Sequence, residues 1–216
     1  MQLPWAEQLR RLPRLVVGLV VFGAGVACAI AGDWGLPGWD VFHQGLAEQT
    51  PLTIGQATIA VGAVLLLAMV ALREPIGVGT VGNVLLIGLS VDATLWLLDE
   101  PSDPVVRAGL TLVGPLVVAV GSGLYLGVRL GSGPRDGIMT ALDRRGVTLW
   151  KARFGIEAAA LVAGVILGGT IGWGTIWFLV IIGPAVQAAL RVLSVPLAAG
   201  EQVNQAEPGA GDPGRE

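Results

Sequence analysis

The sequence predicts an all-α polytopic membrane protein in which six transmembrane helices form a 3+3 inverted-topology repeat, accompanied by two short helices. Three observations support this fold class: an apolar composition, an internal duplication and a one-sided distribution of basic residues. Of the 216 residues, 53% are hydrophobic and 13% are charged, and the mean hydropathy is +0.72. Together with apolar runs of about twenty residues, this composition excludes a soluble domain.

Apolar runs place the predicted transmembrane helices, three in each half of the chain. They are expected at Leu15–Gly32, Thr53–Leu72, Gly79–Leu98, Val105–Val128, Phe154–Ile171 and Gly174–Leu193. Residues 1–199 are therefore predicted to be a single transmembrane domain, with repeat one at 15–98 and repeat two at 105–193. Residues 200–216 are polar and rich in Gly, Pro and acidic residues. They predict a disordered cytoplasmic tail, with a partner-binding peptide as the alternative.

The two halves are related in sequence. Residues 72–80 read LREPIGVGT and residues 167–175 read LGGTIGWGT, with five of nine positions identical. The same offset of 95 aligns residues 83–95 with 178–190, and an offset of 96 aligns residues 35–46 with 131–142. Internal duplication in a strongly apolar chain is typical of transporters and channels.

The basic residues predict the orientation in the membrane. Cytoplasmic loops are enriched in Lys and Arg, and with both termini cytoplasmic twelve of the thirteen basic residues lie inside, Arg107 being the exception. A unit of three helices ends on the side opposite its start, so the second repeat is inverted relative to the first. Five tryptophans fall near the outer helix ends, as an aromatic belt requires: Trp34, Trp39, Trp96, Trp173 and Trp177.

The N-terminal arginines, followed by an apolar stretch and Ala27-Cys28-Ala29, also resemble a cleavable signal peptide. The repeat favours retention, because residues 15–32 align with residues 111–128 and match Gly18 with Gly114 and Gly25 with Gly121.

Two short segments, LPGWD at 36–40 and SGPRD at 132–136, follow the first helix of each repeat. Each places Pro and Gly before an Asp, as at the start of a helix. A helix of about ten residues is roughly 15 Å long, about half of a bilayer core. We expect two re-entrant helices that enter from opposite sides and bring their Asp-bearing ends together near the midplane. The alternative is an amphipathic interfacial helix, which the apolar Val41, Phe42 and Leu46 against the polar Asp40 and His43 would suit.

The candidate substrate-binding residues on these segments are Trp39, Asp40, His43, Arg135 and Asp136. Asp40 and Asp136 occupy matching positions and are expected to have equivalent roles. A carboxylate already occupies the positive end of each short helix, so a cation, a proton or a neutral polar solute is expected rather than a free anion. Arg135, which replaces Trp39 in the second copy, works against that expectation.

Polar residues within the predicted spans add two candidates. Asp92 and Gln187 occupy equivalent positions in the two repeats and are expected to line the route. The alternative for Asp92 is that it reaches toward the outer interface. Glu157, four residues after Arg153, predicts a local ion pair.

The motifs GLPGWDVFHQGL at residue 35, TIGQ at 53, GVGT at 77 and GSGPRDG at 131 resemble the YczE/YitT-type family of bacterial multipass membrane proteins. Family members show Gly-x-Gly-Pro-Trp-Asp at the first motif, whereas this chain has its Pro displaced by one position. The resemblance implies a similar architecture but supplies no substrate.

The sequence thus predicts a transporter of a small solute in the bacterial inner membrane, with binding between the repeats. The alternatives are a passive channel with paired re-entrant helices and a non-transporting accessory protein that scaffolds an assembly. No enzyme is expected, since no nucleophile and base are paired. With only Cys28 and His43, we expect no metal site and no cofactor. No nucleic-acid partner is expected; the lipid bilayer is the expected surrounding, and a homodimer is left open.

Overall fold

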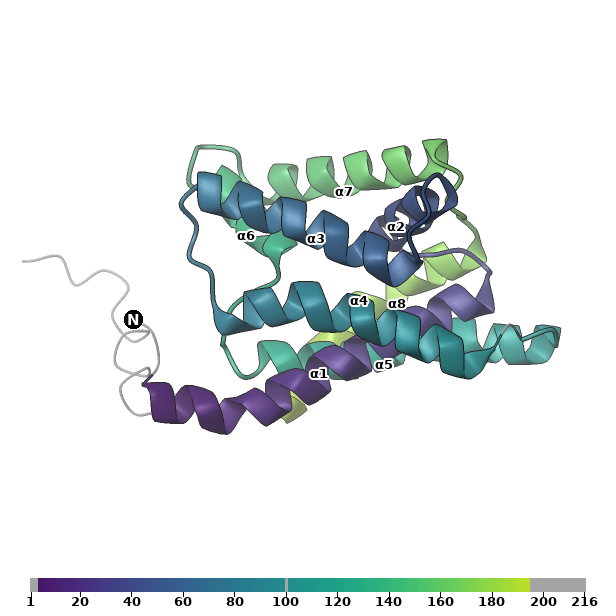
Figure 1. The fold of residues 1–216 in the computed structure, drawn as a ribbon, viewed down its shortest axis with the longest axis horizontal. Coiled ribbons are helices and arrows are strands. Elements are labelled where there is room, and N and C mark those ends of the chain that lie inside the picture. The colour runs from purple at the N-terminus through teal and green to yellow at the C-terminus, as the bar shows by residue number, and fades with distance from the viewer. Residues whose placement is uncertain (1–3, 100, 195–216) are drawn as a thin grey trace, which may run out of the picture.

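The computed structural model describes residues 4–99 and 101–194, which form eight helices and no strand (Figure 1). The helices are α1 (Trp5–Gly32), α2 (Gly38–Glu48), α3 (Ile54–Ala71), α4 (Val78–Leu98), α5 (Pro104–Leu126), α6 (Pro134–Asp143), α7 (Leu149–Ile166) and α8 (Trp173–Leu193). The tail predicted for residues 200–216 lies outside the described residues.

Five of the six predicted spans correspond to helices that are long and apolar enough to cross a membrane: α1, α3, α4, α5 and α8. The protein is therefore a multipass α-helical membrane protein. The sixth prediction, Phe154–Ile171, was wrong in its boundaries. α7 begins five residues earlier, includes Lys151, Arg153 and Glu157, and is not among the five. It ends at Ile166 because Gly168, with φ of 101°, turns the chain out of the helix.

Local sequence explains the other helix ends. α3 starts at a capping box, in which Thr53 accepts a hydrogen bond from the Gln56 amide and the Gln56 side chain accepts one from the Thr53 amide. α5 starts with Pro104 after Asp103, whose carboxylate accepts the amide of Val105. α1 begins at Trp5, ten residues before the predicted span, because its charged first turns remain helical.

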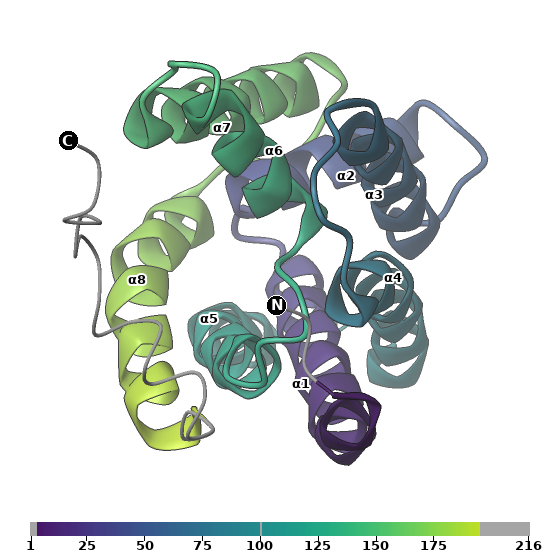
Figure 2. The same ribbon diagram turned by 90° about the vertical axis from the view of Figure 1, so that its left-hand side faces the viewer.

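α1 and α5 form the central pair of the bundle, with α4 and α8 on opposite sides of it (Figure 2). Glycines allow their backbones to approach closely. A Cβ at Gly25 would meet the Val118 amide nitrogen and the Gly114 carbonyl oxygen, too close for any side chain. A Cβ at Gly121 would likewise meet the amide nitrogen of Phe22 and the carbonyl oxygen of Gly18.

α2 and α6 occupy the interior of the second layer, between α3 and α7 (Figures 1 and 2). In Figure 1, α6 lies at the left end of the bundle and α2 at the right end. The two short helices therefore enter the bundle from opposite ends.

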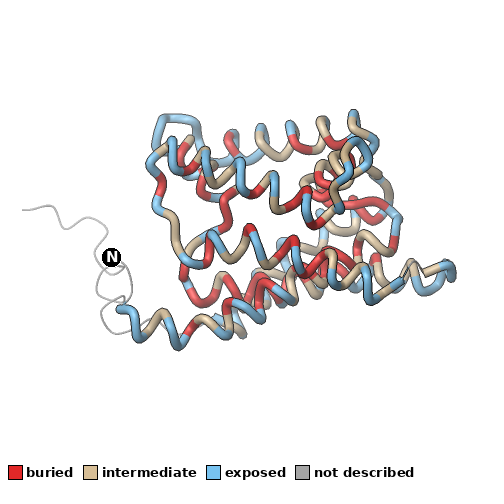
Figure 3. The backbone as a smooth tube through the Cα atoms, viewed as in Figure 1, coloured by how far each residue is buried: buried red, intermediate tan, exposed pale blue. Residues whose placement is uncertain are grey.

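Buried segments lie where helices face one another, and exposed segments lie on the outward faces (Figure 3). The exposed side chains include many large apolar ones, for example Leu67, Leu97 and Leu179. Apolar side chains on the outer faces suit a lipid environment, because the hydrocarbon core of the bilayer is as apolar as they are.

Candidate functional site

Side chains from the first turns of α2 and α6 meet in the interior of the bundle. The guanidinium carbon of Arg135, on α6, lies 4.6 Å from the centroid of the Trp39 ring, on α2. A cation over an indole face at this distance is attracted by the ring quadrupole, by about 2 kcal/mol where water is excluded. The structure thus brings together the two motifs that the sequence analysis expected to approach each other.

On α2, Asp40 and His43 form a buried polar pair. His43 Nδ1 lies 3.3 Å from Asp40 Oδ1, and both residues are less than a tenth exposed. Their spacing of three residues places them on one face of the helix. An interfacial helix would turn this face toward water, whereas the structure buries it against the neighbouring helices. The arrangement favours the interior position for α2.

Arg135 is bound on one side only. Within the described residues no carboxylate forms an ion pair with it and no acceptor receives a hydrogen bond from it. The charges of Asp40 and Asp136 act on it through space. A guanidinium carries five N–H donors, so its contact with Trp39 leaves its hydrogen-bonding capacity unused.

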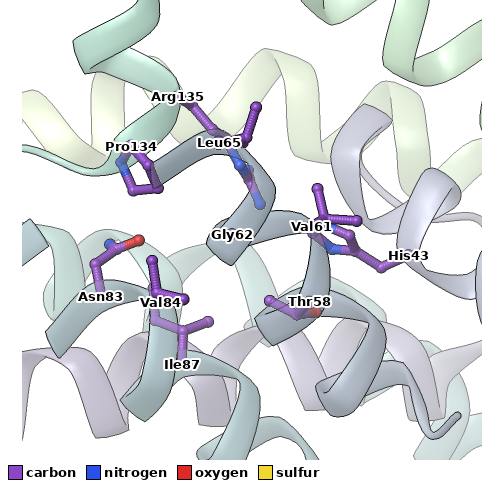
Figure 4. A pocket seen from close by; sticks show the side chains of 10 residues that line it. All are labelled: His43, Thr58, Val61, Gly62, Leu65, Asn83, Val84, Ile87, Pro134 and Arg135. Atoms are coloured by element: carbon purple, nitrogen blue, oxygen red, sulfur yellow. The ribbon is translucent and has the colours of Figure 1, made fainter. Parts of the chain in front are cut away.

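The unused donors face a small cavity between α2, α3, α4 and α6 (Figure 4). Its volume of about 20 Å³ is enough for about one water molecule. In Figure 4, Arg135 and His43 extend toward this space from opposite sides. The lining residues are His43, Thr58, Val61, Gly62, Leu65, Asn83, Val84, Ile87, Pro134 and Arg135.

Asp136 is placed differently from Asp40. It is exposed, and its side chain does not cap α6. The hydroxyl of Thr140 donates to the backbone carbonyl of Asp136 at 2.9 Å, not to its carboxylate. The matching sequence positions of the two acids therefore correspond to different environments.

Asp92 reaches the start of α3. Its carboxylate accepts the Thr53 hydroxyl at 2.5 Å and the Gly55 amide at 2.9 Å. These bonds satisfy donors at a helix N-terminus and give Asp92 a stabilising role there. Gln187 is exposed on α8, on the other side of the α1–α5 pair (Figure 2). The structure does not bring Asp92 and Gln187 together, and their part in a route stays a prediction.

Sequence reasoning assigned no role to two polar residues of the cavity, Thr58 and Asn83. Thr58 lies one turn inside α3 and donates its hydroxyl to the Ile54 carbonyl at 2.9 Å. Asn83 lies in the second turn of α4, and its amide lies within 4 Å of the position that a Cβ on Gly133 would take. Spacing along the chain carries no signal for either, because their proximity to Arg135 arises from packing between helices. The ion pair predicted for Arg153 and Glu157 is confirmed, with Nε and Oε1 3.1 Å apart.

Fold and site together define a multipass α-helical membrane protein with a small cavity inside its helix bundle, lined by both polar and apolar residues. Comparison with known proteins identifies the family. Residues 9–191 match the model of a family of unknown function, DUF6198, and the chain belongs to that family. An uncharacterized protein of Haemophilus influenzae is 31% identical over 191 residues, 88% of each chain.

A second relative connects this family to the resemblance seen in the motifs. The uncharacterized membrane protein YczE of Bacillus subtilis is 31% identical over 169 residues, which cover 77% of this chain and 79% of that protein. The resemblance to the YczE type is thereby confirmed. No solved structure matches the chain.

Proposed function

We propose that the protein is a transporter of a small solute in the bacterial inner membrane, built from two inverted repeats at 15–98 and 105–193, with both termini cytoplasmic. The solute binds between the repeats, where the first turns of α2 and α6 meet. The observation that carries the proposal is a set of tertiary contacts that occur twice, at sequence offsets of 95 and 96.

The first pair of contacts joins the start of a long helix to the loop before a short one. The Gly79 amide donates to the Leu130 carbonyl at 2.9 Å, and the Gly174 amide donates to the Trp34 carbonyl at 2.7 Å. Each donor and acceptor of the first bond has its repeat equivalent in the second. A duplicated chain folded as an inverted repeat produces such reciprocal bonds.

The second pair closes the two ends of the bundle. Gln49 Nε2, just after α2, donates to the Leu167 carbonyl at 3.0 Å. The equivalent of Gln49, Arg145 just after α6, donates to the Leu72 carbonyl at 3.0 Å. Each short helix is thus attached at its far end to the last turn of a helix in the other repeat.

The third pair accounts for the only basic residue on the outer side. Arg11 donates to the Val128 carbonyl at 3.1 Å, near the end of α5. Its equivalent, Arg107, donates to the Gly32 carbonyl at 3.3 Å, at the end of α1. Free carbonyls at a helix end favour a cation. Arg107 therefore stabilises the end of α1 as Arg11 stabilises the end of α5, and this role outweighs the preference of basic residues for the cytoplasmic side.

The proposal counts α7 as the sixth crossing. Its ion pair between Arg153 and Glu157 neutralises two of its three charged side chains, and the third, Lys151, lies in its first turn, where a lysine can reach the interface. Three helices per repeat then place the two repeats in opposite orientations.

Flux measurements on purified protein in proteoliposomes test the proposal. Concentrative uptake of a solute driven by an ion gradient is the expected result. Passive equilibration without accumulation would identify the alternative, a channel. The absence of any flux, combined with co-purification of a partner at fixed stoichiometry, would favour the accessory protein.

Topology is tested separately, in a Cys28→Ser background. Pro101→Cys should react with an impermeant thiol reagent from outside, and Gly146→Cys from inside. Labelling of both positions from one side would rule out the inverted repeat.

A further inference from the structure

The cavity between α2, α3, α4 and α6 has a chemical bias that its lining residues determine. None of the ten lining residues is an Asp or a Glu, and the only one with a permanent charge is Arg135. A cation in this cavity would find no carboxylate ligand and would lie beside a guanidinium. An anion would find the guanidinium with its donors unused.

The other polar groups of the cavity are those of Asn83, His43 and Thr58. The Asn83 side chain can donate two hydrogen bonds from its amide nitrogen. His43 Nδ1 lies 3.3 Å from Asp40 Oδ1, and Asp40 is not itself a lining residue. Thr58 already donates its hydroxyl hydrogen to Ile54. Arg135 and the Asn83 amide nitrogen therefore supply the donors, and the side-chain oxygens of Thr58 and Asn83 remain acceptors.

Partial burial favours an acceptor for Arg135, which is neither fully exposed nor fully buried. A guanidinium that loses part of its hydration gains from hydrogen bonds that replace it. The stacking on Trp39 replaces only part of this loss, because it satisfies none of the five N–H groups. An occupant that accepts hydrogen bonds and carries negative charge compensates more than water does, since charge-assisted bonds are roughly twice as strong as neutral ones.

We propose that this cavity is the binding site for a small monovalent anionic group, held by the Arg135 guanidinium and the Asn83 amide, with Trp39 fixing the guanidinium. The inference rests on the proposed transport function and specifies its substrate class. It differs from the cation, proton or neutral polar solute expected from Asp40 and Asp136, because neither residue lines the cavity. The small volume fits a single inorganic ion, or the carboxylate end of a solute whose remainder requires the helices to separate.

Binding is measured as the shift of the thermal unfolding midpoint of purified protein in a neutral detergent, at constant ionic strength. The probes are the sodium salts of chloride, nitrate, formate and propionate, with sodium gluconate as the reference. Saturable stabilisation by at least one of these anions is expected. Preference for chloride or nitrate indicates an inorganic ion, and preference for formate or propionate indicates a carboxylate.

Three variants assign the effect to the site. Arg135→Gln should weaken the apparent affinity by about tenfold or more, because it removes the charge and the paired donors. Arg135→Lys should retain part of the effect. If Arg135→Gln does not fold, Asn83→Ala is measured in its place, and it should also retain only part of the effect. The matched control is Arg73→Gln, which removes one charge from an exposed residue with no contact to the cavity; its affinity should be unchanged.

Equal anion stabilisation of the wild type, Arg135→Gln and Asn83→Ala would overturn the proposal, as would the absence of saturable anion stabilisation in the wild type. Saturable stabilisation by potassium or choline, without any by anions, would also overturn it. Flux distinguishes the two claims. Anion binding without flux would retain the site and reject transport, whereas cation flux without anion binding would reject the site and retain transport.

Discussion

α2 and α6 occupy equivalent places in the two halves of the molecule but differ in chemistry. Both are short, enter the bundle from opposite ends and contact the opposite half through equivalent hydrogen bonds. α2 carries a buried Asp40–His43 pair, whereas α6 carries Arg135 without a carboxylate partner and an exposed Asp136. Hydrogen bonds to the Leu167 and Leu72 carbonyls occur at both short helices, whereas the side chains that face the interior differ. The difference between α2 and α6 therefore lies in their interior side chains.

The largest effect is expected where the two copies agree, at the glycines between α1 and α5. Gly25→Ala and Gly121→Ala should each lower the free energy of unfolding by about 1–3 kcal/mol, because the new methyl groups meet backbone atoms. Thermal unfolding in detergent measures the change. The control is Gly109→Ala on α5, where a Cβ meets nothing within 4 Å and where alanine should be neutral or stabilising. A large loss in only one of the two glycine variants would show that the halves are not equivalent.

The next effect separates the two acids that follow Trp39 and Arg135. Asp40→Ala should lower the free energy of unfolding by about 2 kcal/mol, because it leaves the buried His43 without its partner. Asp136→Ala should change the free energy of unfolding by no more than about 0.5 kcal/mol, since that residue is exposed. Paired unfolding measurements under identical conditions provide the comparison. Equal losses in the two variants would restore the equivalence that the sequence positions suggest.

A smaller effect is expected at the two equivalent positions within the long helices. Asp92→Leu should lower the free energy of unfolding by about 1–2 kcal/mol, because the Thr53 hydroxyl and the Gly55 amide lose their acceptor. Gln187→Leu should have almost no effect, since Gln187 is exposed on α8. Flux measured on both variants tests the route. Loss of flux in Gln187→Leu with unchanged stability would support a route through that position.

These comparisons show which levels of structure the sequence could predict. Hydropathy located five spans and the repeated motifs paired the two short helices, because apolar runs and repeated motifs can both be read along the chain. The boundaries of α7 were missed, since Lys151 and Arg153 remain helical when a neighbouring helix covers one side. The cavity residues Thr58 and Asn83 were missed for a different reason. Their relation to Arg135 depends on how α3 and α4 pack on α6, and no local pattern records that packing.

The smallest effect concerns the two ends of the bundle, where the attachment differs in charge. Glu74 is buried and forms ion pairs with Arg144 and with Arg145, the latter at 3.9 Å. At the opposite end the equivalent of Arg145 is the neutral Gln49, which donates to the Leu167 carbonyl. Both arginine side chains are about half exposed, so solvent reduces the strength of the pairs. Glu74→Gln should therefore lower the free energy of unfolding by only about 1 kcal/mol at low salt. Breaking an ion pair with both partners fully buried would lower it by more.

Salt dependence distinguishes this loss from a general loss of packing. At 0.01 M salt the Debye length is about 30 Å, and at 1 M it is about 3 Å, so the difference in unfolding midpoint between the wild type and Glu74→Gln should shrink as salt is added. Gln49→Ala removes a neutral hydrogen bond and should lower the midpoint by the same amount at every salt concentration. Unfolding titrations from low to high sodium gluconate measure both differences, with gluconate chosen because it serves as the reference anion for the cavity. If the Glu74→Gln difference is independent of salt, packing around the carboxylate holds this end, and the two ends are attached by the same kind of interaction.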